Sequence, residues 1–147
     1  MGKVFKDKPI SEITLRRFER PFNEDRDSLV RKFCISLGLL QPGDSRDVIV
    51  DILKLLLEAR KNRQVLSSKD VEIKIKSTRS EGTAGSNIRR QILRLERLGF
   101  AEKFEGGYRL REFMSLLEIL EGHIKKFMID PTIERINEYA KEIDKKF

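Results

Sequence analysis

Four arginines lie close together in the middle of this 147-residue chain, at positions 89, 90, 94 and 97 of the stretch GSNIRRQILRLERL. Two polar residues, Ser86 and Asn87, come just before them. An arginine guanidinium forms paired hydrogen bonds with phosphate or guanine, and an asparagine amide forms them with adenine. The residue types in this stretch therefore suit contact with nucleic acid.

The charge distribution points to the same region. The chain carries a net charge of +7, and residues 45–114 hold 16 lysines and arginines against 10 acidic residues. The flanking segments are nearly balanced, at 9 against 7 before this region and 6 against 7 after it. A basic excess in one region favours an acidic partner, nucleic acid first.

Residues for other kinds of site are scarce. Cys34 is the only cysteine and His123 the only histidine, so we expect a buried thiol and a structural histidine rather than a metal centre or a catalytic group. The sequence contains no phosphate-binding glycine loop, dinucleotide motif or nucleophile elbow. We therefore predict a protein that is not an enzyme and that uses no cofactor and no metal.

Length and composition bound the class of protein. No apolar run is long enough to span a membrane, and the polar start MGKVFKDKP does not resemble a signal peptide. We expect a soluble, cytoplasmic protein that makes no membrane contact, built as one domain with appended helices. Scarce Gln and abundant Lys, Arg, Glu and Ile are typical of a thermophile.

The N-terminal extension, residues 1–44, is predicted to be helical. A short first helix that Pro21 ends remains open. Its apolar face would be Ile10, Ile13, Leu15 and Phe18. A second helix is expected over 24–37, with Asn23 as its N-cap and Gly38 after its end.

The central region, 45–113, is predicted to contain three helices followed by a hairpin. The first helix covers 45–62 and begins at a cap formed by Asp44 or Ser45. Its very wide apolar face suits a helix that packs on more than one side.

The second helix of this region is expected over 68–77. The letters VEIKIK alternate like a strand. Ser67 and Asp70, however, have the spacing of a capping box, which favours a helix.

The third helix is the arginine-bearing one, over 85–98. Thr83 or Ser86 is its expected cap and Gly99 its expected stop. Its buried stripe is expected to be Ile88, Ile92, Leu95 and Leu98. Two short strands, 100–105 and 107–113, then meet at a turn formed by Gly106 and Gly107.

The C-terminal segment, 114–147, is predicted to be helical and to serve packing or dimerisation. Ser115 caps its first helix, and Asp130 caps a second one that begins with Pro131. The second helix has apolar residues at steps of 3, 4, 3 and 4, the spacing of a coiled-coil seam. These are Ile133, Ile136, Ala140, Ile143 and Phe147.

The stretch SNIRRQILRLERLGFAEKFEGGYRL has a polar helix start, a basic run, Leu-x-x-Leu-Gly-Phe and a hairpin. This pattern resembles the recognition helix and wing of a winged helix-turn-helix domain of archaeal and bacterial transcription regulators. The resemblance covers roughly residues 45–113. It implies a mainly α fold with a small β-hairpin, here with extra N- and C-terminal helices, and a regulator that binds double-stranded DNA, in our expectation as a homodimer.

The resemblance also implies which residues touch DNA. Helix 85–98 would enter the major groove, and the hairpin 100–112 would lie beside it as the wing. The implied contacts on the helix are Ser86, Asn87, Arg89, Arg90 and Arg94. The implied contacts on the wing are Lys103, Arg109 and Arg111.

One feature departs from the family pattern. The turn between the second and third helices usually has three or four residues, whereas STRSEGTAGS has ten. This loop either moves the second helix from its usual place or contacts DNA itself through Arg79.

Three other interpretations stay open. The arginines alternate with Glu96 and Glu102, so they also suit a solvated face with ion pairs. The apolar faces of the terminal helices suit a protein-interaction module in a replication, chromosome-segregation or transcription complex. An RNA-binding winged helix ranks lower, because most of the nine Phe and two Tyr occupy predicted core positions.

Overall fold

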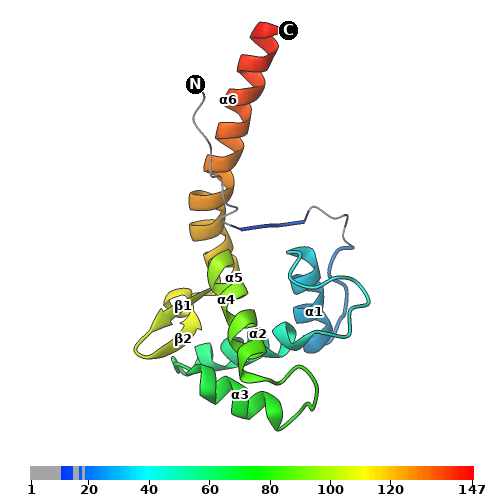
Figure 1. The fold of residues 1–147 in the computed structure, drawn as a ribbon, viewed down its shortest axis with the longest axis vertical. Coiled ribbons are helices and arrows are strands. Elements are labelled where there is room, and N and C mark those ends of the chain that lie inside the picture. The colour runs from blue at the N-terminus through cyan, green and yellow to red at the C-terminus, as the bar shows by residue number, and fades with distance from the viewer. Residues whose placement is uncertain (1–10, 15–16, 18) are drawn as a thin grey trace.

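The computed structural model describes residues 11–14, 17 and 19–147 of the chain. It is mainly helical and has one two-stranded antiparallel hairpin, which confirms the predicted fold class at this level (Figure 1). The first helices are α1 (Arg26–Ser36), α2 (Val48–Lys61), α3 (Ser68–Lys76) and α4 (Gly85–Leu98). The later elements are β1 (Ala101–Phe104), β2 (Gly107–Leu110), η1 (Arg111–Phe113), α5 (Leu116–Ile119), η2 (Leu120–Ile129) and α6 (Asp130–Lys146).

Helix α1 begins later than predicted. Asn23 is not its cap, because it has a left-handed φ of 49°. Asp25 takes that role, and its side chain accepts a 2.7 Å hydrogen bond from the amide of Ser28. Gly38 follows the helix with a φ of 77°, as expected of a helix stop. Residues 11–14 form no helix; the other residues of the possible first helix, 10, 15 and 18, lie outside the described residues.

Helix α2 also begins later, and neither predicted cap is used. The residue at its start is Asp47, whose side chain makes no capping hydrogen bond. Its carboxylate is bound instead by Arg31 and Arg79. The start of α2 is therefore held by ion pairs from Asp47 to distant arginines, and not by a side-chain cap at Asp44 or Ser45.

Helix α3 confirms the choice of helix over strand. The Ser67 hydroxyl accepts from the Asp70 amide at 3.0 Å, and the Asp70 carboxylate accepts from the Ser67 amide at 3.0 Å. Just before this cap, Leu66 forms an antiparallel bridge with Tyr108, at 3.0 and 2.7 Å. The hairpin is thereby tied to the connection between α2 and α3.

Helix α4 has the predicted bounds and the predicted buried stripe. Its cap differs, because Ala84 stands at the N-cap position and no side chain caps the helix. Gly99 ends it with a φ of 101°, in the left-handed conformation that suits glycine.

The hairpin turn is shifted by one residue from the prediction. Strand β1 pairs with β2 so that Phe104 lies opposite Gly107, which leaves Glu105 and Gly106 as the turn. Both have positive φ, at 46° and 79°. Gly107 is a buried strand residue, and a Cβ on it would lie 2.7 Å from the carbonyl oxygen of Leu66. Glycine is needed there for close packing rather than for the turn.

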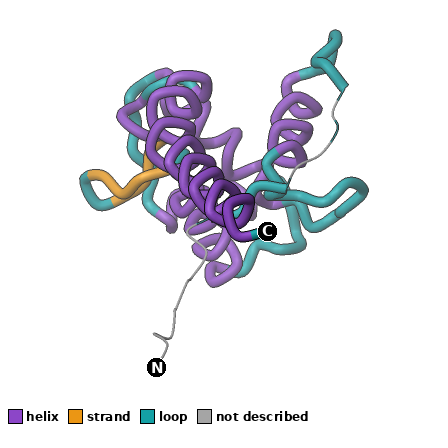
Figure 2. Tube along the Cα trace, turned by 90° about the horizontal axis from the view of Figure 1, so that it is seen from above, coloured by secondary structure: helices purple, strands orange, loops and turns teal. Residues whose placement is uncertain are grey.

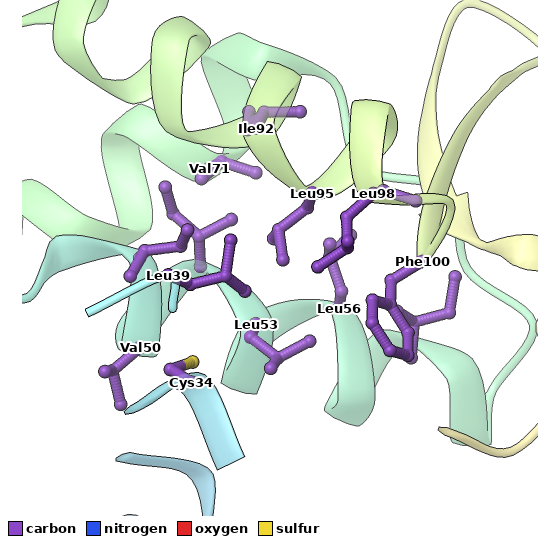
Figure 3. Packing of buried hydrophobic residues seen from close by; sticks show 14 of the residues in the cluster. Cys34, Leu39, Val50, Leu53, Leu56, Val71, Ile92, Leu95, Leu98 and Phe100 are labelled. Atoms are coloured by element: carbon purple, nitrogen blue, oxygen red, sulfur yellow. The ribbon is translucent and has the colours of Figure 1, made fainter. Parts of the chain in front are cut away.

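One hydrophobic core joins α1, α2, α3, α4 and the hairpin (Figure 3). Leu53 and Leu56 of α2 lie at its centre, with Leu95 of α4 packed over them. Phe100, fully buried, meets Phe33 of α1 edge to face at 5.5 Å. Cys34 is buried in the same cluster. The wide apolar face of α2 is explained by this central position.

The C-terminal segment forms one continuous helical rod. Ser115 caps α5, as predicted, with a 3.1 Å hydrogen bond from the amide of Glu118. The rod passes through a π-helical stretch, η2, and continues into α6 without a break. Asp130 is therefore not an N-cap. Pro131 sits inside the rod, and the Thr132 hydroxyl donates to the Met128 carbonyl at 2.6 Å.

The elements differ in how closely they join the body, by which we mean the part of the protein built around the hydrophobic core. The hairpin projects at the edge of the helical bundle (Figure 2). Helix α6 extends away from the body, in the direction opposite to α3 (Figure 1). Among the described residues, no helix is both long and apolar enough to cross a bilayer.

Candidate nucleic-acid interface

The outward face of α4 is built by its helical period. The core takes positions 88, 92, 95 and 98, and the residues opposite them therefore point to solvent. We call these residues, together with Arg89 at their side, the α4 outer face. Its members are Ser86, Arg89, Arg90, Leu93 and Arg97, all exposed.

The arginines of this face are poorly neutralised. Within the described part of the chain, Arg89, Arg90 and Arg97 take part in no ion pair. Arg90 donates one 3.0 Å hydrogen bond to Asn87, a neutral partner. The nearest acidic influence is Glu72 of α3, whose pKa is held below its ordinary value by a hydrogen bond from Lys76 and by nearby charges that include Arg89. Glu72 forms its ion pair with Lys76, at 2.7 Å, and none with Arg89.

Asn87 and Arg94 turn away from this face. Arg94 donates to the carbonyl of Leu39 at 2.9 Å, which ties α4 to the loop between α1 and α2. Asn87 is half-buried and donates to the carbonyl of Gly82 at 2.9 Å. Both side chains stabilise the surroundings of α4, so their donors are largely used within the protein.

A polar hollow of about 560 Å³ lies on this flank of α4. The loops before α2 and before α4 form its other walls. Its charged lining residues are Asp44, Arg46, Arg79, Glu81, Arg90 and Arg94. Arg46 and Arg79 are paired with carboxylates and Arg94 is bound to a carbonyl, so Arg90 is the least compensated cation of the lining.

The hairpin arginines are held by their own element. Glu102 of β1 binds both, Arg109 at 2.8 Å and Arg111 at 3.3 Å. The Arg109 guanidinium also lies 3.5 Å from the ring centre of Phe104, and its side chain is only 15% exposed. Lys103 is exposed and has no ion pair among the residues that the structure describes. Of the three basic residues predicted on the wing, only Lys103 is exposed and outside any ion pair among the described residues.

The long loop before α4 is anchored rather than free. Arg79 binds Asp47 at 2.6 Å and Asp51 at 3.0 Å, at the N-terminal end of α2. Asn87 holds the other half of the loop through Gly82. The loop therefore packs beside α2, and the guanidinium of Arg79 is occupied by protein carboxylates.

Two residues of the α4 outer face, Leu93 and Arg97, were not among the contacts that the resemblance implied. Both lie at helical steps from Arg90, at three and seven residues, so they share its face. That spacing was the available signal. Leu93 is 37% exposed although it is apolar, which makes it the hydrophobic centre of an otherwise basic face.

The lone cysteine and histidine lie away from this face. Burial raises the pKa of the Cys34 thiol to about 12, so it is held in its protonated form at neutral pH. Burial, together with the charge of Arg111, lowers the pKa of His123, which packs beside Gly99. Within the described ranges, no three His, Cys, Asp or Glu side chains gather as metal ligands would.

No protein-family model matches the chain. Likewise, no curated protein and no solved structure matches it.

Proposed function

We propose that this chain is a winged helix-turn-helix protein that binds double-stranded DNA and regulates transcription. Helix α4 would enter the major groove, which is ~12 Å wide and accepts one helix. The order of elements supports this proposal: α2, the bridge at Leu66, α3, α4 and then the hairpin.

One observation carries the proposal. The arginines around α4 fall into two sets, and those on the α4 outer face are the unpaired ones. Arg79, Arg109 and Arg111 are bound by carboxylates, and Arg94 by a carbonyl. A cluster of exposed cations without protein carboxylates suits phosphate and guanine contact.

The proposed contacts follow from this division. Arg89, Arg90 and Arg97 would contact phosphates or guanine, and Ser86 a phosphate at the start of α4. Leu93 would meet apolar base edges such as thymine methyl groups. Lys103 would reach the backbone from the wing.

The test is binding of a fluorescent random-sequence duplex, followed by anisotropy over a salt series. We expect affinity that falls steeply with salt for the native chain. Replacing Arg89 and Arg90 together with Ala should weaken binding by at least about tenfold at low salt and lower the log–log slope by roughly 1–2. Unchanged binding would rule out this face.

A matched control removes the same charge elsewhere. Lys141→Ala with Lys145→Ala takes two cations from the exposed α6, so the net charge falls equally. We expect this variant to bind DNA nearly as the native chain does. Equal loss in both variants would mean that only total charge matters.

A second candidate function is a protein-interaction module in a replication, chromosome-segregation or transcription complex. The observation that favours it is the exposed apolar stripe of α6. Negligible DNA binding by the native chain at low salt would favour this candidate instead.

A further inference from the structure

Helix α6 has no hydrophobic partner among the described residues. It runs for 17 residues from Asp130 to Lys146, and none of them is buried. An isolated helix of this length is marginal in water, because most helical stability in proteins comes from packing an apolar face. The rod therefore lacks the contact that normally stabilises such a helix.

The apolar residues of α6 form a single stripe. Ile133, Ile136 and Ile143 are 50%, 56% and 55% exposed, and Phe147 is fully exposed. With Ala140 they repeat at the a and d spacing of a coiled coil, so we call these five residues the α6 seam. A contiguous exposed apolar stripe of this kind marks an interaction surface.

The opposite face of α6 is built for solvent. Arg135 pairs with Glu138 at 3.5 Å, and Lys145 pairs with Glu142 at 3.3 Å. Both pairs lie at positions c and f of the heptad, away from the seam. One apolar face and one charged face suit docking against another helix.

We propose that the α6 seam pairs in parallel with the α6 of a second copy of this chain. Positions that flank the seam decide the orientation. In a parallel pair, Tyr139 lies across from Asp144 of the second copy, where its hydroxyl can donate to the carboxylate. Thr132 likewise lies across from Asn137 of the second copy, and both pairs form twice by symmetry.

The antiparallel arrangement lacks both of these cross-helix pairs. It packs Ile133 against Ile143 of the second copy, which places Asp130, held by Lys125 at 3.2 Å, opposite Asp144 at both ends. Two ionised carboxylates cannot hydrogen-bond to each other, so this arrangement offers nothing in place of the Tyr139–Asp144 pair. The smallest symmetric assembly is a dimer, the commonest form among soluble oligomers.

A parallel dimer places both bodies at the same end of the rod. Each body then presents its own α4 outer face, related by a two-fold axis. This consequence rests on the proposed function, because duplex DNA with two half-sites has the same symmetry. The dimer itself is tested without DNA, so the two proposals can fail independently.

The first experiment measures the mass of the full-length chain in solution across a concentration series. We expect a mass that rises to twice the 17.2 kDa of one chain. Ile136→Glu with Ile143→Glu should give a monomer at every concentration, while the body keeps its cooperative unfolding. The control, Lys141→Gln with Lys145→Gln, changes the net charge equally on the outer face and should remain a dimer.

The second experiment determines orientation by oxidative cross-linking. Ile133→Cys should form a covalent dimer on its own, because position 133 meets itself only in the parallel pair. The buried Cys34, with its raised pKa, does not compete. Cross-linking only in a mixture of Ile133→Cys and Ile143→Cys chains would show the antiparallel form and overturn the proposal. A native chain that stays monomeric, or one that forms trimers or larger assemblies, would overturn it equally.

Discussion

At the scale of single residues, identical side chains have opposite surroundings in this protein. Arg90 on α4 has one neutral hydrogen-bond partner, whereas Arg109 on the hairpin has a carboxylate and two aromatic rings around it. A guanidinium that is already paired and stacked gains little from a phosphate. The proposed distinction between a DNA-contacting arginine and a structural one thus rests on the neighbours of each side chain.

Arg109→Lys tests this distinction on the hairpin. Lysine keeps the charge but loses the planar group that lies over Phe104 at 3.5 Å and over Phe113 at 4.8 Å. We expect the free energy of unfolding to fall by about 1 kcal/mol, measured by urea denaturation. DNA affinity should change little.

Lys103→Ala is the complementary variant. Its side chain is exposed on the neighbouring strand, so we expect unchanged stability and a modest loss of DNA affinity. The opposite result, with Arg109→Lys losing affinity and keeping stability, would contradict this assignment of roles.

At the scale of elements, the hairpin is positioned by one close backbone approach. Gly107 lets β2 come so near the α2–α3 connection that Leu66 and Tyr108 exchange hydrogen bonds. Any Cβ at position 107 would lie within 2.7 Å of the Leu66 carbonyl oxygen. The bridge thereby sets the position of the hairpin relative to α3 and α4.

Gly107→Ala should therefore destabilise the fold by roughly 3 kcal/mol, because backbone must move to relieve the overlap. Gly106→Ala is the matched variant one residue earlier. It has open space around it and a φ of 79°, so only the left-handed conformation is penalised, by about 1 kcal/mol. Thermal unfolding of both variants gives the comparison. Equal losses would show that the contact with Leu66 is unimportant.

At the scale of the whole molecule, Asp47 joins segments that are far apart in the chain. Its carboxylate accepts from Arg31 of α1 and from Arg79 of the loop before α4. Burial tends to raise the pKa of Asp47, but the hydrogen bonds from Arg79 and Arg31 outweigh it, and the net pKa is lowered. The ionised form is thus the one that the fold stabilises.

The lowered pKa of Asp47 determines how the stability of the fold depends on pH. The stabilisation by Asp47 is present above its unfolded pKa of 3.8 and is lost as the pH falls through the lower folded value. Asp47→Asn should cost roughly 1–3 kcal/mol at neutral pH, measured by urea denaturation. The difference from the native chain should shrink as the pH is lowered below 3.8. A difference that stays constant down to strong acid would contradict this account.

At this scale the molecule has two parts, the body and the projecting helix α6. The body has its own core, while α6 projects from it with its seam uncovered (Figure 1). If α6 dimerises in parallel as proposed, the rod sets the spacing between two α4 outer faces. DNA affinity would then depend on how rigidly the rod joins the two bodies as well as on the arginines themselves.

The sequence alone determined the elements whose causes are local. The stripe at 88, 92, 95 and 98, the capping box of Ser67 and Asp70, and Gly99 as a helix stop all act within a few residues. Each was predicted with the right type of element. The α6 seam was visible in the same way, from its spacing.

Only the tertiary structure decided the features that depend on distant residues. Helix α2 begins after Asp47 with no side-chain cap, because the carboxylate of Asp47 is bound by arginines from other segments. Gly107 packs in a strand instead of forming the turn, because the backbone of Leu66 lies against it. Which arginines remain unpaired was decided in the same way, by carboxylates and carbonyls brought in from elsewhere in the chain. Sequence spacing places a side chain on a face of its helix, but the fold determines what that face meets.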